Sequence, residues 1–229
     1  MKVAIMQPCY LPWRGYFALM RHCDVFVHLD DVALPTGRSY QTRVAIKTAA
    51  GRRWLTVPVA RTRGQLIRDV PIVEGPWRRK HLRTLEQELP HAAELVADLY
   101  AEPPPALAAF NAALAARIAT RLGIATAVEW SSHLNVPGRG SDKIIGLCQQ
   151  LGADTYVTGH GARHYLDHER AESLGIDVCY VDYDLASYPQ PHGVFDPFVT
   201  MLDAIEHASE PAAVARARLV PWRTFLAPA

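Results

Sequence analysis

The sequence contains no apolar run that approaches the roughly 18 uninterrupted residues of a membrane-spanning helix. Its first residues also lack the pattern of a secretory signal, in which basic residues precede an apolar stretch and a cleavage site. These two absences argue against membrane insertion and against export. We therefore expect a cytoplasmic protein that has no membrane partner.

Cysteine is also scarce. The four cysteines are far apart in the 229-residue chain and form no C-x-x-C pair. This spacing indicates neither a zinc ribbon nor a disulfide framework, so we expect free thiols. The residues are Cys9, Cys23, Cys148 and Cys179.

The chain also has almost no net charge, but its charged residues are unevenly distributed along the sequence. The net charge is +1, yet residues 38–83 hold twelve of the 24 lysines and arginines and only two acidic residues, Asp69 and Glu74. A region of one sign attracts ligands of the opposite sign. This segment therefore predicts a phosphate-bearing small molecule or a nucleic acid as ligand, unless its side chains are spread over several solvated faces.

Short apolar runs rich in β-branched and aromatic residues indicate strands in the first third of the chain. The runs cover residues 2–6, 24–29, 40–48, 53–60 and 69–75. Polar and apolar residues alternate in the third and fourth runs, and the connection AAGRR contains a glycine. These two runs therefore predict an antiparallel hairpin.

The middle of the chain, about residues 76–122, is expected to be helical. Pro76 suits the first turn of a helix, Pro90 predicts a break or kink, and Gly123 is expected to end the segment. Strands and helices then alternate, and Ser141 is expected to cap a helix. The closing segments PFVTMLDAIEHA and PAAVARARL are expected to be helical.

Two of the later strands are expected to begin directly after a helix that ends on glycine, in LGADTYVTG and LGIDVCYVDY. This arrangement is typical of βαβ units and of a parallel sheet. We therefore predict a single α/β domain over residues 1–229. It has a mainly parallel sheet flanked by helices, with an early antiparallel β-hairpin insertion.

Ligands of parallel sheets bind where loops leave the carboxyl ends of the strands. Four such loops are expected to meet: MQPCYLPWRGY, HLDD, VTGHGARHYLD and VDYDLASYPQPHG. Aromatic rings there can stack on a base or a sugar, and two basic residues four apart on one strand can reach the same phosphate. The predicted substrate-binding residues are Gln7, Pro8, Tyr10, Trp13, Gly15, Tyr16, Arg43, Lys47, Thr158, Gly159, Tyr165 and Gln190.

Two motifs in these loops are weak signals of other chemistry. The first loop resembles the H-x-G-H helix start of nucleotidyltransferases, but Trp13 and Tyr16 stand where the two imidazoles would be. His160, His164 and His168 have the spacing of zinc ligands on one helical face, yet the glycines beside His160 place it in a loop. We assign no metal ligand, and a metal-dependent hydrolase at these histidines is kept as an alternative.

The whole pattern resembles the WbqC-like family, bacterial proteins of O-antigen and related sugar-modification gene clusters. The resemblance runs nearly end to end. It includes AIMQPCYLPWRGYFALM, DVFVHLDDV, YQTRVAIKT, WLTVPV, WRRKHLRTL, LGADTYVTGHGARHYLD and YPQPHGVFDPFVTMLDAI. It implies a modifying enzyme that acts on nucleotide-linked amino sugars and transfers glycine or another aminoacyl group to a sugar amine.

Acyl transfer to an amine requires a base for the amine proton and donors that hold the oxyanion. The predicted catalytic residues are Asp30, Asp31 and His81 as candidate bases and Lys80 as a donor, with Arg43 and Gln7 as further donors. Successive strand residues point to opposite faces, so at most one of the two aspartates enters the crevice unless the chain turns. Lys80 and His81 lie near a helix start, where a cation suggests an anionic partner.

The resulting hypothesis is an acyl or aminoacyl transferase that modifies an amino sugar or a similar small amine in glycan or natural-product biosynthesis. Its donor stays open between a free amino acid with ATP, an aminoacyl-tRNA and an aminoacyl-thioester, so no cofactor is certain. The alternative from another class is a nucleic-acid-binding module, with tRNA as the partner of residues 38–83. The sequence leaves the oligomeric state open.

Overall fold

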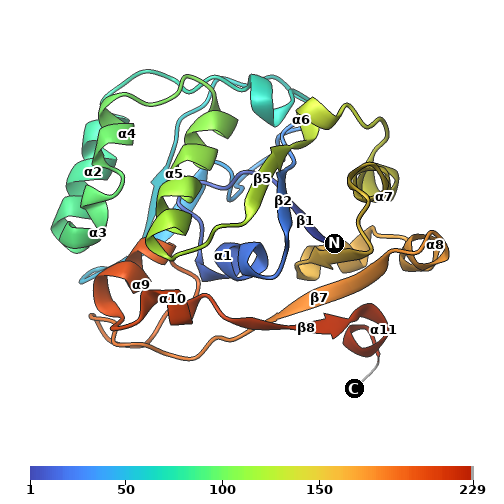
Figure 1. Cartoon of the computed structure of the whole chain (residues 1–229). Helices are drawn as coiled ribbons and strands as arrows, with labels where there is room; N and C mark the ends of the chain where they lie inside the picture. Colours follow the sequence, from blue (N-terminus) through green and yellow to red (C-terminus); the bar gives the residue numbers. More distant parts are fainter. Residues whose placement is uncertain (228–229) are drawn as a thin grey trace.

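A six-stranded sheet forms the centre of the protein (Figure 1). The computed structural model describes residues 1–227. The strand order is β5-β2-β1-β6-β7-β8, and every neighbouring pair is parallel except β7 with β8. The strands are β1 (Lys2–Met6), β2 (Val25–His28), β5 (Ala127–Trp130), β6 (Thr155–Thr158), β7 (Asp177–Tyr183) and β8 (Ala217–Pro221). The predicted α/β fold with a mainly parallel sheet is confirmed.

Helices cover both faces of this sheet. The helices are α1 (Arg14–Arg21), α2 (Trp77–Glu88), α3 (Pro90–Glu94), α4 (Ala97–Ala101), α5 (Leu107–Arg121), α6 (Ser131–Leu134), α7 (Gly140–Leu151), α8 (His168–Ser173), α9 (Met201–His207), α10 (Pro211–Val214) and α11 (Trp222–Phe225). Two 3-10 turns are η1 (Ile67–Asp69) and η2 (His160–His164). In β1, Ala4 packs into the core that contains α1 and α5, whereas Val3 and Ile5 pack with α7. Alternate strand residues thus serve the two layers, as the pleat requires.

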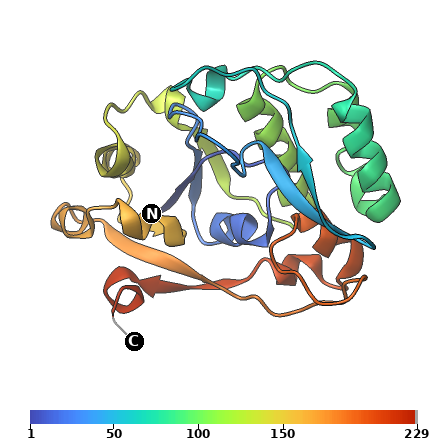
Figure 2. The ribbon, with the colours of Figure 1, turned by 180° about the vertical axis from the view of Figure 1, so that it is seen from behind.

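A separate antiparallel hairpin confirms the predicted insertion. Its strands are β3 (Arg43–Thr48) and β4 (Gly51–Thr56). Figure 2 shows the hairpin in front of α5, with one end near α9. Ile46 and Leu55 join the core that contains α5. The Thr200 amide donates to the Ala45 carbonyl at 3.0 Å, which ties the hairpin to the segment before α9.

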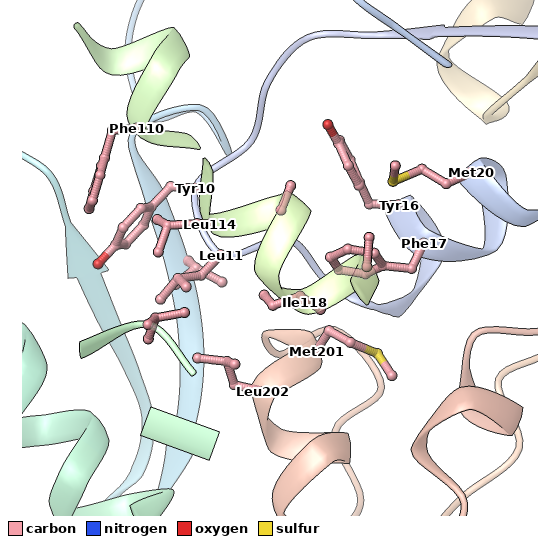
Figure 3. Close-up of a cluster of buried hydrophobic side chains, with 14 of the residues drawn as sticks. Tyr10, Leu11, Tyr16, Phe17, Met20, Phe110, Leu114, Ile118, Met201 and Leu202 are labelled. Carbon is pink, nitrogen blue, oxygen red and sulfur yellow. The ribbon is translucent and has the colours of Figure 1, made fainter. Parts of the chain in front are cut away.

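The largest buried cluster joins α1, α5 and α9 (Figure 3). Phe17 of α1, Leu114 of α5 and Leu202 of α9 are each fully buried in it. Tyr10 and Tyr16, on either side of the start of α1, are also buried in this cluster, at 1% and 3% exposure. The loop after β1 therefore contributes much of its aromatic surface to the core.

Three local expectations were wrong. The run over residues 69–75 forms isolated bridges and no strand. Ser141 lies inside α7, where its hydroxyl accepts from the Asp167 amide, and Arg139 occupies the N-cap position. In the segment PAAVARARL the helix ends at Val214, and β8 begins at Ala217 because the residues from there on pair with the edge of β7. Tertiary pairing outweighs helix propensity there.

The strand order reverses between β1 and β6, and this reversal places the site. From β1 the chain moves outward to β2 and β5 through α1 and the central helices, and it then returns across the sheet to β6 and β7. Connections that leave in opposite directions open a crevice at the carboxyl ends of the two central strands.

Candidate functional site

A cavity of about 710 Å³ lies at the carboxyl ends of β1 and β6, where the strand order reverses. Met6 and Gln7 contribute from the end of β1, and Thr158 and Gly159 from the end of β6. The end of β7, the loop before α1, Leu29 after β2, Tyr40 before β3 and the segment before α9 supply the remaining walls. All four expected loops therefore contribute to the cavity at this edge.

Aromatic rings form the walls of this cavity. The Trp13 indole lies 5.0 Å from the Tyr183 ring and 5.5 Å from the Phe198 ring, measured between centroids. Tyr40 and Tyr165 also line the cavity and are 62% and 49% exposed, so they stand at its mouth. Flat apolar walls of this kind suit the faces of a sugar ring or a base.

Gly15 explains how Trp13 reaches the wall. A Cβ atom at Gly15 would overlap the indole carbons of Trp13, so the ring lies directly over the first turn of α1. The Gly15 backbone is thus approached by a side chain of this protein. Gly15 is one of the predicted substrate-binding residues, but it does not line the cavity. Trp13 is also tied to Thr200 through a β-bridge, which fixes the indole beside the segment before α9.

Replacing Gly15 with alanine is expected to push the indole off the wall. The added methyl group overpacks the first turn of α1, which costs about 1–3 kcal/mol of stability. We expect a lower melting temperature and weaker ligand binding. Gly161→Ala is the matched control, because its Cβ atom would meet nothing within 4 Å. Equal melting temperatures for the two variants would contradict this account of Gly15.

The polar groups of the cavity are few and well anchored. Thr158 donates to the Tyr156 hydroxyl at 3.1 Å, and a Cβ atom at Gly159 would lie 2.8 Å from the Tyr183 hydroxyl. His160 Nε2 lies 2.9 Å from the Val181 carbonyl oxygen. A carbonyl can only accept, so Nε2 carries the proton and Nδ1 of the neutral ring is the acceptor. His160 thus presents one basic nitrogen.

The sequence predicts basic residues at the ligand, but the charged lining of this cavity is acidic. Among residues 1–227 no lysine or arginine lines it, and its one carboxylate is Asp182. Asp182 Oδ2 accepts from Arg218 Nε at 2.7 Å, an arginine of β8 whose side chain is 80% exposed. The lining therefore favours an uncharged ring or an amine over a phosphate.

The structure brings five of the twelve predicted substrate-binding residues to this cavity. They are Gln7, Trp13, Thr158, Gly159 and Tyr165. The others lie elsewhere. Pro8 and Tyr16 are buried, and Tyr10 is buried against Phe110 with its hydroxyl 2.9 Å from His81 Nδ1.

His81 lies away from the cavity, in the buried cluster with Tyr10 and Trp77. Burial, with a smaller contribution from the charge of Arg53, lowers the pKa of His81 to about 4. This buried imidazole, hydrogen-bonded to Tyr10, stabilises the packing of α2 against the core. The neighbouring Lys80 is exposed on α2.

Asp30 and Asp31 lie at the end of β2 and are bound to α6 and α7. Asp30 Oδ1 accepts from the Ser132 amide at 3.0 Å, and Oδ2 accepts from the Ser132 hydroxyl at 2.8 Å. Asp31 Oδ2 accepts from Lys143 Nζ at 2.5 Å, and Oδ1 accepts from the Ser131 hydroxyl at 2.6 Å. Asp30 is 3% exposed. Neither carboxylate lines the cavity.

Arg43 and Lys47 do not share a ligand position. The Arg43 guanidinium stacks on the Trp54 ring at 3.9 Å. Lys47 is buried and donates to Gln190 Oε1 at 3.1 Å and to the Val194 carbonyl at 2.6 Å. Lys47 and Gln190, both predicted to bind substrate, thus contact each other and hold the segment before α9 in place.

Most other basic residues of the segment 38–83 are exposed. Arg52 is paired with Asp196 and Arg78 with Glu74. The nucleic-acid-binding interpretation stays a prediction.

The three spaced histidines do not converge. His160 bonds to Val181, His164 contacts Arg163, and His168 Nε2 lies 2.8 Å from the Tyr180 hydroxyl. Within the described part of the chain no group of three histidine, cysteine or acidic residues could hold a metal ion. The histidine cluster therefore does not provide the site that a metal-dependent hydrolase needs.

The cavity residues that the sequence did not identify include Tyr40, Asp182, Tyr183 and Phe198. The segment VDYD is expected at the crevice, but strand alternation selects only one of the neighbours Asp182 and Tyr183, whereas both line the cavity. Phe198 carried no signal, because its position depends on the bridge between Trp13 and Thr200. From the sequence, His160 is a weak metal-ligand candidate in a loop, and no role in catalysis is predicted for it.

The comparisons with known proteins place the chain in a family. Residues 7–214 match the WbqC-like protein family, and the chain belongs to it. The chain is also 37% identical over 215 residues to uncharacterized protein Rv1507c of Mycobacterium tuberculosis, a match that covers 89% of this chain and 92% of that protein. No solved structure shows a significant match. None of the helices in residues 1–227 combines the length and apolar character needed to cross a bilayer.

Proposed function

We propose that the protein is an acyl or aminoacyl transferase that modifies the amine of an amino sugar or a similar small amine in glycan or natural-product biosynthesis. Membership in the WbqC-like family agrees with a role in sugar modification. The observation that carries the proposal is the cavity at the strand reversal, with its ring-lined walls and, within residues 1–227, a single carboxylate, Asp182. Such a lining suits a sugar ring with an amine.

In this proposal the sugar ring stacks on Trp13 and Tyr183, and Gln7 and Thr158 bond to its hydroxyl groups. Asp182 attracts the ammonium form of the amine. Any nucleotide phosphates stay outside the cavity, because no cation lines it within residues 1–227. This arrangement replaces the sequence-based assignment of phosphate binding to Arg43 and Lys47.

His160 is the base in this proposal. The bound ammonium first loses one proton to solvent, and Nδ1 takes a second proton as the neutral amine nitrogen attacks the carbonyl carbon of an ester, a thioester or an acyl phosphate. A C–N bond forms, the C–O or C–S bond to the carrier breaks, and the proton passes to the leaving oxygen or sulfur. Asp30, Asp31 and His81 lie outside the cavity, so they are less suited to this step.

Product analysis tests the proposal. The protein is incubated with glucosamine or a nucleotide-linked amino sugar and one donor at a time: glycine with ATP, glycyl-tRNA or an acyl thioester. Mass spectrometry is expected to detect an amide product with one of these donors. If the sugars bind but no donor yields an amide, the proposed transferase is wrong.

A pair of phenylalanine variants tests whether this cavity is the site of binding and reaction. Gly161 lines the cavity with open space at its Cβ position, so Gly161→Phe is expected to fill the cavity and abolish sugar binding and product formation. Arg163→Phe adds the same ring to the same turn at an exposed position outside the lining and is expected to retain both. Equal activity of the two variants would contradict the assignment of this cavity.

A further inference from the structure

A second cavity, of about 330 Å³, lies beside the segment that follows β7. Among the residues that the structure describes, it shares no lining residue with the cavity at the strand reversal. Its polar lining residues include Arg14, Asp184, Ser187, Ser209, Glu210 and Arg216. Successive residues here serve different cavities: Trp13 lines the first and Arg14 lines the second.

Arg14 is an unusual cation for its degree of burial. It is 4% exposed, and one nitrogen, Nη1, donates to the Ala186 carbonyl at 2.8 Å. Nε and Nη2 are buried and have no hydrogen-bond partner in the described residues. The rings of Phe195 and Tyr188 lie 5.3 and 5.9 Å from the guanidinium carbon. Buried charged donors without partners are rare, so these two require an explanation.

The two free nitrogens form the fork that a carboxylate accepts. The same protein shows this pairing at Arg52, whose Nε and Nη2 donate to the two carboxylate oxygens of Asp196 at 2.8 and 2.5 Å. Arg14 carries the equivalent pair beside a cavity. A carboxylate that binds both nitrogens would satisfy the buried cation with two parallel hydrogen bonds.

The second cavity also contains negative charge. Asp184 and Glu210 line it together with the two arginines, and Asp184 Oδ1 accepts from the Ala186 amide at 2.8 Å. A phosphate would be repelled by these carboxylates, whereas a compound with charges of both signs can pair with both sets. We propose that this cavity binds a small zwitterion of the α-amino acid class.

In the proposed complex the ligand carboxylate binds Nε and Nη2 of Arg14. The ligand ammonium lies near Glu210 and Asp184. The site does not depend on the acyl transfer proposed above, because none of its residues lines the first cavity.

Calorimetric titration of the full chain tests this site with L-alanine, acetate and ethylamine. L-Alanine is expected to bind more tightly than either single-charge fragment. Arg14→Lys keeps the charge but loses the fork, so it is expected to weaken alanine binding roughly tenfold or more. Glu210→Gln, at an exposed position, is expected to weaken alanine binding and leave acetate binding unchanged.

Arg117→Lys on α5 is the control and is expected to bind like the wild type. Circular dichroism checks that each variant is folded, and the Glu210 variant decides the outcome if Arg14→Lys does not fold. Absence of alanine binding would overturn the proposal. Binding that is the same in wild type and in the Glu210 variant would also overturn it.

Discussion

Replacing Lys143 with methionine is expected to lower the free energy of unfolding by about 3–5 kcal/mol. Lys143 Nζ lies 2.5 Å from Asp31 Oδ2 and 2.5 Å from the Val136 carbonyl oxygen. The two charged side chains are only 5% and 13% exposed. Removing the cation leaves the Asp31 carboxylate buried with the Ser131 hydroxyl and without an opposite charge.

Urea denaturation of Lys143→Met and of a control measures this effect. The control is Lys80→Met on α2, an exposed lysine whose loss is expected to change stability by less than about 0.5 kcal/mol. The double variant Asp31→Leu with Lys143→Met is expected to recover part of the loss, because no unpaired charge remains. A loss below about 1 kcal/mol in Lys143→Met would show that this ion pair contributes little.

Acidification is expected to destabilise the fold through two buried imidazoles. Burial lowers the pKa of His28 to about 4, and burial together with the charge of Arg53 does the same for His81. Unfolding returns each ring to a pKa of about 6.5. The unfolded chain therefore binds these protons first, so stability is complete above pH 6.5 and declines as the pH falls toward 4.

The expected loss at pH 4 is about 3 kcal/mol for each imidazole, or about 6 kcal/mol for both. Urea denaturation at pH 7.5 and at successive lower values measures it. His81→Gln keeps a hydrogen-bonding group for Tyr10 and removes one titrating ring, so it is expected to lose about half of the pH dependence in this range. A slope that is the same in wild type and in this variant would contradict the assignment.

The sheet could be predicted from the sequence because its signals are local. β1, β2, β6 and β7 are short apolar runs that begin or end at glycine or polar residues, and each appears close to its expected position. β8 could not be predicted, because the segment around Arg218 is a strand only where the edge of β7 is available for pairing. Local propensity does not contain that information.

The candidate site was predictable in position but only partly in composition. A parallel sheet places the loops after its strands at one edge. From this rule Gln7, Trp13 and Thr158 are expected to lie together, and all three line the cavity. Whether a ring at the end of a strand faces the cavity or the core depends on packing, and Tyr10 faces the core. The basic residues of segment 38–83 were expected to bind the ligand because they are numerous. The sequence does not show toward which surface each side chain points.

The central claim is that the cavity at the reversal between β1 and β6 binds the ring of an amine-bearing sugar. Amide and indole N–H spectra of the protein titrated with glucosamine, with glucose 6-phosphate as the comparison, test it most directly. We predict that glucosamine shifts the signals of Gln7, Thr158, Gly159 and the Trp13 indole, and that Gly161→Phe removes these shifts. Shifts confined to the basic hairpin or to the Asp31–Lys143 pair, or stronger shifts with the phosphate, would contradict the claim.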